Sequence, residues 1–332
     1  MYCIASMKEF DRSVDYFLNR SIILYGASNS GKSTVIKDIL FMLKSHIPNI
    51  CVICPTNDLN SSYDGIVPRP LIHPEVSEQL LDDILKRQSL NVKLYNLAND
   101  ITKLEHIYSQ LNLNSSEIQR LKNAYDTVSL RVSEDDLSKL TSTHNSALVS
   151  AYKKSISQCK RLDGLNENDK ILVRHININP NFLIIIDDAA VTANKWCKYD
   201  ATKELFFNGR HHKITFMIAM QDDKPLDSML RKNAFINIFT TEQVCNTYFN
   251  RTANNFTKKE KVEAEANSAK VFNGSERYKK LIYLRESNDK FRYFTARINE
   301  DFIFGSPFLI KYCEQVTRND SEFNASDFEK FL

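Results

Sequence analysis

Nine consecutive residues form a loop whose composition suits the binding of phosphate. The segment Gly26-Ala27-Ser28-Asn29-Ser30-Gly31-Lys32-Ser33-Thr34 has the spacing G-x-x-x-x-G-K-S and lies between an apolar run and a helix-forming run. Backbone N–H groups of residues 28–33 must point into one concavity, so the turn needs glycine where a side chain would block it. The start of the next helix adds its positive dipole end. We expect Lys32 to bridge the β- and γ-phosphates of ATP and Ser33 to bind Mg²⁺; the alternative is a loop that has lost binding.

Two acidic residues follow a second apolar run, in the segment FLIII-Asp187-Asp188. We expect Asp187 to hold Mg²⁺, the role of the carboxylate that follows a buried strand in enzymes with this loop. Asp188 stands where a base would polarise the attacking water. Glu is the commoner residue at that place, so the shorter Asp leaves the rate of hydrolysis open. The alternative for Asp188 is a solvated acid at the end of a strand.

One amide and two arginines are further candidates for the chemistry. Gln221 follows the run ITFMIA, so we expect it at the sheet edge beside the two motif strands, where it can sense the γ-phosphate or the water. Arg210 precedes the same strand. It is either a solvated or salt-bridged residue, or a transition-state finger inserted into a neighbouring subunit, with Arg231 as the substitute. The adjacent His211 and His212 lack metal-ligand spacing.

The elements that must position these residues alternate between strands and helices. Short, nearly continuous apolar runs predict strands of a parallel sheet covered on both faces. Residues 278–286 and 291–298 alternate around a turn and predict a β-hairpin. The predicted strands are residues 21–25, 50–54, 182–186, 214–219 and 235–239, and predicted helices include 32–46 and 201–209. The sequence therefore predicts an α/β fold with a mainly parallel sheet.

The sheet is interrupted by a segment that lacks helix breakers. Residues 75–170 contain one glycine and no proline, and they are rich in residues that favour helices. A period of three and four runs through residues 90–111 and resumes at 118–128, which predicts two helices in an antiparallel hairpin. A third amphipathic stretch covers residues 148–159. We expect residues 1–74 and 171–332 to form one domain, and 75–170 a helical insertion that either packs on itself or binds a partner as a coiled coil.

The amino-acid composition excludes several classes of protein. The 332 residues carry 44 Lys+Arg against 41 Asp+Glu, so a nucleic-acid site has to be local. No apolar run reaches the roughly 20 residues that span a bilayer, and the start of the chain lacks the apolar region of a secretion signal. Twenty Phe and 14 Tyr exclude disorder as the main state. Cys51 and Cys54 form one C-x-x-C pair in an apolar run, which favours buried thiols in a reducing compartment.

Taken together, GASNSGKST, FLIIIDDAA, GRHHKITFMIAMQD and LRKNAFINIF resemble the genome-packaging ATPases of nucleocytoplasmic large DNA viruses. That family includes the poxvirus packaging ATPase and belongs to the FtsK–HerA superfamily of P-loop, RecA-like DNA pumps. The similarity covers about residues 20–74 and 175–310 and leaves the insertion unmatched.

The resemblance implies a ring, a pentamer or hexamer, that threads double-stranded DNA into a preformed capsid using ATP and Mg²⁺. By position, Gly26, Gly31, Lys32 and Ser33 take the Walker-A role, Asp187 and Asp188 the Walker-B role, and Gln221 the sensor role. Arg210 matches the arginine finger less securely. The resemblance further implies a capsid, portal-vertex or membrane-associated viral partner, and a location in the viral factory of the host cytoplasm or with the virion.

Other functions stay open at this stage. Another translocase or helicase of the same superfamily would use the same residues. A nucleotide kinase usually needs an arginine-rich lid, and no compact R-x-x-x-R segment follows Asp188. A non-catalytic assembly module would use the nucleotide only to lock its fold. A translocase also needs cations that grip phosphates without reading bases. The candidates are Lys195, Lys198, Lys224, Arg231, Lys232, Lys258, Lys259 and Lys261.

Overall fold

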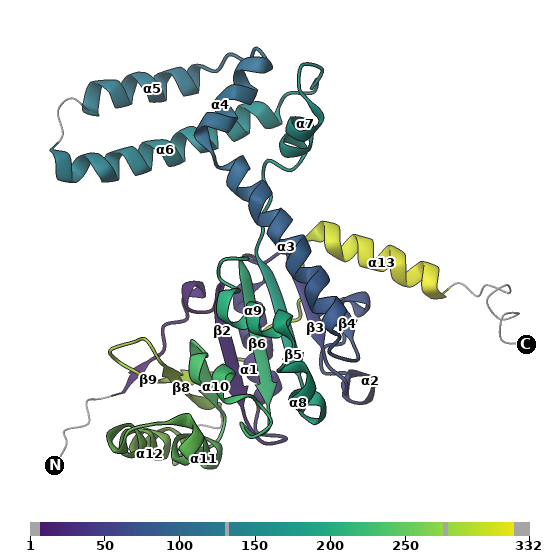
Figure 1. The fold of residues 1–332 in the computed structure, drawn as a ribbon, viewed down its shortest axis with the longest axis vertical. Coiled ribbons are helices and arrows are strands. Elements are labelled where there is room, and N and C mark those ends of the chain that lie inside the picture. The colour runs from purple at the N-terminus through teal and green to yellow at the C-terminus, as the bar shows by residue number, and fades with distance from the viewer. Residues whose placement is uncertain (1–6, 130–132, 275–277, 322–332) are drawn as a thin grey trace, which may run out of the picture. The chain divides into compact units, whose positions relative to one another are not determined.

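The computed structural model describes residues 7–129, 133–274 and 278–321. Within them, nine strands form one sheet in the order β1-β9-β8-β7-β2-β6-β5-β3-β4 (Figure 1). From β7 to β4 every neighbouring pair is parallel, whereas β8 is antiparallel to both β7 and β9. The strands are β1 (Lys8–Glu9), β2 (Ser21–Tyr25), β3 (Asn49–Ile53), β4 (Ile72–His73), β5 (Phe182–Asp187), β6 (Ile214–Met220), β7 (Ile236–Phe239), β8 (Lys279–Leu284) and β9 (Phe291–Thr295).

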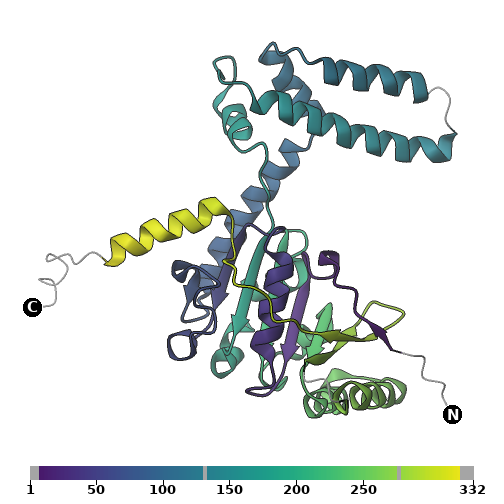
Figure 2. The ribbon, with the colours of Figure 1, turned by 180° about the vertical axis from the view of Figure 1, so that it is seen from behind.

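Helices cover both faces of this sheet. Figure 1 shows α9 and α10 on one face, and Figure 2 shows α1 on the other. Alternate residues of β2 divide between two apolar cores, Ile23 and Tyr25 in one and Ile22 and Leu24 in the other. The bounds are α1 (Lys32–Leu43), α2 (Asn57–Asn60), α3 (Glu78–Ala98), α8 (Ala193–Trp196), α9 (Asp200–Asn208), α10 (Ser228–Asn233), α11 (Glu242–Asn250), α12 (Lys258–Phe272) and α13 (Pro307–Ser321).

The predicted fold class is confirmed. All five expected strands are present within one residue of their predicted ends, and β8 and β9 form the expected antiparallel hairpin. Strands buried on both faces cannot alternate polar and apolar residues, which is why continuous apolar runs located them. The short outermost strands of the sheet, β1 and β4, were not predicted. In the described residues no helix has the length and apolar character to cross a membrane.

The chain divides into two compact units, Met1–Lys86 with Asn181–Leu332 and Arg87–Pro180. The second unit contains α4 (Ile101–Gln110), α5 (Ser116–Ser129), α6 (Glu134–Ser157) and α7 (Glu167–Arg174). Its own core includes Leu104, Ile107, Ile118, Tyr152 and Ile156. The predicted domain division, with a helical insertion over residues 75–170, stays a prediction.

Two details of the predicted helices are wrong. The periodic stretch 90–111 is not one helix, because it breaks before α4, where the Asp100 side chain accepts hydrogen bonds from the backbone N–H groups of Thr102 and Lys103. The antiparallel hairpin is made by α5 and α6 (Figure 1), and not by the first two periodic stretches. Periodicity identifies the apolar face of a helix but not the helix it packs against.

A buried carboxylate on α1 holds the segment that follows β9. Asp38 is fully buried, pairs with the Arg12 guanidinium at 2.9 Å, and accepts from the backbone N–H of Arg297 at 2.9 Å. It also accepts from the Asn299 amide at 3.0 Å. Residues from before β2 and after β9 are thereby tied to the helix that follows the phosphate loop.

We predict that Asp38→Ala lowers the free energy of unfolding by about 3 kcal/mol, because it leaves Arg12 and two further donors without their acceptor. Urea denaturation at neutral pH measures this loss. Asp289→Ala is the matched control, since Asp289 pairs with Lys8 at the surface and its removal should cost at most about 1 kcal/mol. Equal losses in both variants would contradict the anchoring role of Asp38.

Candidate nucleotide-binding site

The loop between β2 and α1 has the geometry of a phosphate cradle. Gly31 has φ +89°, in the left-handed region that favours glycine. A Cβ on Gly26 would lie 1.9 Å from Thr240 Oγ1 and 2.6 Å from Ser30 Oγ, so no larger residue fits there. Gly31 is therefore required by its backbone conformation, and Gly26 by the side chains next to it. The loop leads directly into the N-terminus of α1, as the motif requires.

The Lys32 ammonium folds back over the loop. Its Nζ donates to the carbonyl of Gly26 at 2.8 Å and to that of Ala27 at 3.3 Å. Carbonyls are weaker partners for an ammonium than phosphate oxygens are, because charge-assisted bonds between ions are stronger. Lys32 is thus held at the loop and can exchange these carbonyls for a phosphate.

Two residues that the sequence analysis missed hold the loop from the neighbouring strands. The hydroxyls of Ser30 and Thr240, the residue after β7, lie 2.6 Å apart. The Lys280 ammonium donates to the Ser30 carbonyl at 2.9 Å, and burial lowers the pKa of Lys280. Lys280 reaches the loop because antiparallel β8 begins at the edge where the parallel strands end. Its only signal in the sequence was a lysine in a predicted strand.

The two acids lie at the end of β5 and are held by the segment after β3. Tyr63 donates its hydroxyl to Asp187 Oδ2 at 2.9 Å, and Thr56 donates to Asp188 Oδ2 at 3.1 Å. Asp188 has φ +53°, which directs the backbone out of the strand at this point. Neither Tyr63 nor Thr56 was predicted, because nothing in the local sequence distinguishes them from loop residues.

Asp187 has the electrostatics of a cation ligand. Burial, and then the charge of Asp188, raise the pKa of Asp187 from 3.8 to about 6, against the hydrogen bond from Tyr63 and the charge of Lys32. Its Oδ1 is buried and has no hydrogen-bond partner in the described part of the chain. A buried carboxylate oxygen without a partner fits Mg²⁺, which prefers oxygen ligands. Ser33, whose hydroxyl the motif assigns to the same cation, is an exposed residue in the first turn of α1.

Gln221 lies at the same edge as the loop. Strand β6 runs between β2 and β5, and the backbone N–H of Gly26 donates to the carbonyl of Met220, the residue before Gln221, at 3.0 Å. Gln221 is exposed. The topology therefore brings the loop, the two acids and the amide to one edge of the sheet, as expected for parallel neighbours.

The two arginines differ in their surroundings. Arg231 is only 6% exposed and pairs with Asp223 at 2.8 Å. Arg251 and the Asn254 amide share that carboxylate, so Arg231 belongs to a buried network between α10 and the segment after α11. This burial contradicts the prediction of Arg231 as a DNA-contacting cation and removes it as a finger.

Arg210 is exposed and precedes β6, whereas Gln221 follows β6. Arg210 therefore lies where the parallel strands begin, at the opposite end from the phosphate loop. Its guanidinium donates to the ring of His211 at 3.3 Å. It lines a hollow of about 460 Å³ with Arg20 and Arg285. Within one chain Arg210 therefore does not act at the phosphate loop, and any role in the reaction requires a second chain.

The remaining predictions concern cations and thiols. Lys195, Lys198 and Lys224 are exposed on segments that follow strands, and Lys258 and Lys259 are exposed at the start of α12. In the described residues no group of three or more His, Cys, Asp or Glu could hold a metal. Cys51 and Cys54 are buried free thiols, and burial raises the pKa of Cys51 to about 12.

We predict that the stability difference between the wild type and Asp187→Asn depends on pH. Between about pH 4 and pH 6 native Asp187 keeps its proton and the unfolded chain releases it, so rising pH destabilises the wild type by up to about 3 kcal/mol relative to the variant. Urea denaturation of the metal-free protein at several pH values measures this. A difference that stays constant from pH 4 to pH 7 would contradict the raised pKa.

The solved structures that are similar to this chain include two that match it along most of its length. The genome packaging NTPase B204 of Sulfolobus turreted icosahedral virus 2, in complex with sulfate, is 14% identical with a TM-score of 0.40, over 85% of this chain and 98% of that one. The bacterial conjugative coupling protein TrwB is 12% identical with a TM-score of 0.36, over 91% and 90%.

The chain has sequence relatives in viruses. No model of a known protein family matches the chain. The uncharacterised protein L437 of Acanthamoeba polyphaga mimivirus is 23% identical over 227 residues, 68% of this chain and 54% of that protein. The uncharacterised protein B354L of African swine fever virus is 32% identical over 325 residues, which cover 93% of this chain and 91% of that protein. Since this identity extends over nearly the whole of both chains, the protein belongs to the family of B354L from African swine fever virus.

Proposed function

We propose that this protein is an ATP-hydrolysing motor of the FtsK–HerA kind that moves double-stranded viral DNA into a capsid. The observation that carries the proposal is the convergence of the phosphate loop, Asp187, Asp188 and Gln221 at one edge of the sheet. Relatives in viruses support a role in the viral cycle. The proposal includes a capsid or membrane-associated partner, and a location in the cytoplasm of the infected cell.

The loop and its lysine would bind the triphosphate. Backbone N–H groups of the loop would donate hydrogen bonds to the phosphate oxygens, and Lys32 would exchange the carbonyls of Gly26 and Ala27 for the β- and γ-phosphates. Lys280 and Thr240 hold Ser30, so the loop keeps its shape while Lys32 moves. Binding energy is then not spent on ordering the loop.

The acids would bind the cation and activate water. Ser33 and Asp187 Oδ1 would hold Mg²⁺, which neutralises charge that develops on the phosphates. Thr56 donates to one oxygen of Asp188 and orients the carboxylate, whose other oxygen is available to accept a proton from water. Gln221 directly follows Met220, whose carbonyl accepts from the Gly26 N–H, and it would signal the loss of the γ-phosphate to β6, the strand between the two motif strands.

A motor of this kind needs a neighbouring subunit. Arg210 lies at the sheet edge opposite the loop, so a ring in which this edge faces the next subunit's loop would supply the missing cation in trans. We propose a ring for this reason, and five or six subunits is the number that the family resemblance implies. Exposed lysines on segments that follow the strands, among them Lys195 and Lys224, would grip the DNA phosphates.

We predict that the purified protein hydrolyses ATP in the presence of Mg²⁺ and that duplex DNA accelerates this turnover. Lys32→Ala should reduce turnover at least about 100-fold by removing phosphate binding. Asp188→Asn should keep ATP bound and reduce turnover by a similar factor, because it removes the base. Phosphate release and equilibrium nucleotide binding measure the two effects.

The controls separate the other functions. Turnover that requires an added nucleoside acceptor would indicate a kinase, and nucleotide binding without turnover would indicate an assembly module. Hydrolysis that persists in Lys32→Ala would contradict the role of the phosphate loop.

We predict further that mixing Arg210→Ala subunits with Asp188→Asn subunits restores part of the ATPase activity that each lacks alone. In a mixed ring an intact Arg210 meets a site with an intact Asp188. A mixture of Lys32→Ala with Asp188→Asn is the matched control, because both defects lie in the same site and restore nothing. A ring that assembles from the first mixture and stays inactive would contradict a trans role for Arg210.

A further inference from the structure

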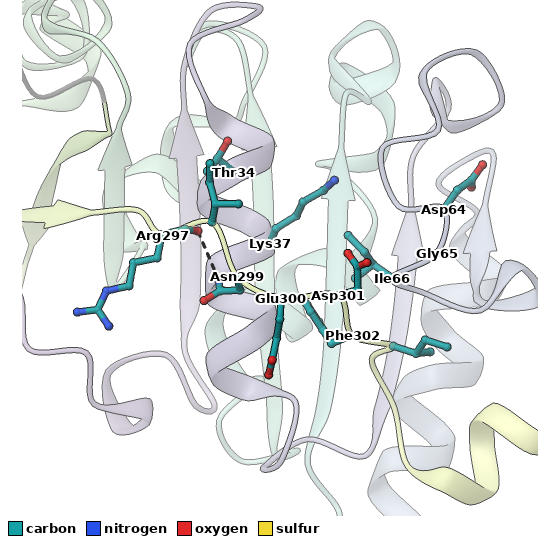
Figure 3. Close-up of a pocket in the computed structure, with 12 residues that line it drawn as sticks. Thr34, Lys37, Asp64, Gly65, Ile66, Arg297, Asn299, Glu300, Asp301 and Phe302 are labelled. Atoms are coloured by element: carbon teal, nitrogen blue, oxygen red, sulfur yellow. Dashed lines mark hydrogen bonds between the residues drawn. The ribbon is translucent and has the colours of Figure 1, made fainter.

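A hollow of about 930 Å³ runs along the exposed face of α1 (Figure 3). This volume lies in the range of about 300–1,000 Å³ that small-molecule sites occupy. One wall is α1 itself, with Thr34 and Lys37, and the other is the segment 297–303 together with the loop at Asp64. All of these residues belong to the same compact unit as the phosphate loop.

The second wall is held in place at both ends. Asp38 on α1 binds the backbone of Arg297 and the side chain of Asn299, and the backbone N–H of Phe304 donates to the carbonyl of Ile66 at 2.7 Å. The ring of Phe302 packs edge-on against that of Phe41, with centroids 5.5 Å apart. The hollow therefore has rigid walls before any ligand enters, which lowers the cost of binding.

The hollow begins where the phosphate loop ends. Thr34 directly follows Ser33 in the first turn of α1 and lines the hollow. Since Lys32 and Ser33 take the β and γ end of a triphosphate, the α-phosphate and the ribose joined to it must leave the loop elsewhere. The hollow lies beside this point and is large enough for a nucleoside.

The lining suits a nucleoside better than a phosphate. Ile298 and Ile303 are 77% and 52% exposed, which gives an apolar surface for a base. The Asp301 carboxylate extends into the same space as Lys37, whereas Glu300 points away along α1 (Figure 3). A carboxylate repels phosphate and accepts hydrogen bonds from ribose hydroxyls, as acidic residues do in dinucleotide sites.

We propose that this hollow binds the base and ribose of the nucleotide whose phosphates the loop holds. Ile298 contacts the base, and Asp301 accepts a hydrogen bond from a ribose hydroxyl. The inference rests on the proposed function, because it assumes a nucleoside triphosphate at the loop, and it deepens that function by naming the residues that recognise the non-phosphate half.

Inorganic tripolyphosphate is the probe that separates the two halves of the site. It can occupy the loop but has no group for the hollow. We expect the full-length wild type to bind the β,γ-methylene analogue of ATP at least about ten-fold more tightly than tripolyphosphate. Ile298→Ala should reduce that preference about five-fold and leave tripolyphosphate binding unchanged. Ile171→Ala is the matched control, since Ile171 is 46% exposed in the other compact unit.

Asp301→Asn tests the sugar contact independently. The wild type should prefer the methylene analogue of ATP over its 2′-deoxy or 3′-deoxy form, and Asp301→Asn should reduce the preference for that hydroxyl without changing tripolyphosphate binding, because a neutral amide oxygen accepts a hydrogen bond more weakly than a carboxylate does. Equal wild-type affinity for the analogue and tripolyphosphate, or variants that change neither preference, would overturn the inference. Tripolyphosphate binding that survives Lys32→Ala would instead refute the phosphate loop, so the two failures are distinguishable.

Discussion

The carboxylate of Asp187 is the charge that the rest of the site has to balance. It ends a strand buried on both faces, so ionising it is costly, and its pKa is raised accordingly. Tyr63 satisfies one oxygen, and the other is buried without a partner in the described residues. Lys32 is the nearby cation, but it is bound to the loop carbonyls. A divalent cation at this place would relieve the cost, which links metal binding to the ionisation of the acid.

Contacts from neighbouring segments hold the phosphate loop and Asp187 in position. Ser30 is held by Thr240 and Lys280, which come from strands on the side of β2 away from the acids. Tyr63 holds Asp187 from the segment after β3, on the other side. The phosphate loop and Asp187 are thus each held by hydrogen bonds from segments on either side of the two motif strands. Rigid placement of this kind lets binding energy act on the reacting groups instead of on ordering the site.

Much of the fold and the two motifs could be predicted because their signals are local. The continuous apolar run that ends in Asp187 and the glycines at fixed spacing before Lys32 can be interpreted from a few neighbouring residues alone, because burial on both faces and the shape of the turn determine them. Contacts between distant segments could not be predicted. Tyr63 meets Asp187 across 124 positions and Lys280 meets Ser30 across 250, and neither sequence environment marks its partner.

The helical unit and the arginines show the same limit. The period of three and four ran on through Asp100, although this residue starts a new helix by capping it. Periodicity likewise gave no sign that α5 would pair with α6. The sequence offered Arg210 as the finger candidate and Arg231 as its substitute, and only the tertiary structure shows that Arg231 is in a buried ion pair while Arg210 precedes β6, at the other end of that strand from Gln221.

The most direct test of the account is a structure of the Asp188→Asn protein trapped with ATP, Mg²⁺ and duplex DNA. The account predicts a ring with the triphosphate in the loop 26–34, the cation next to Asp187 Oδ1 and Ser33, and the neighbour's Arg210 directed at the γ-phosphate. A monomer with nucleotide bound away from this loop, or with no nucleotide at all, would contradict it.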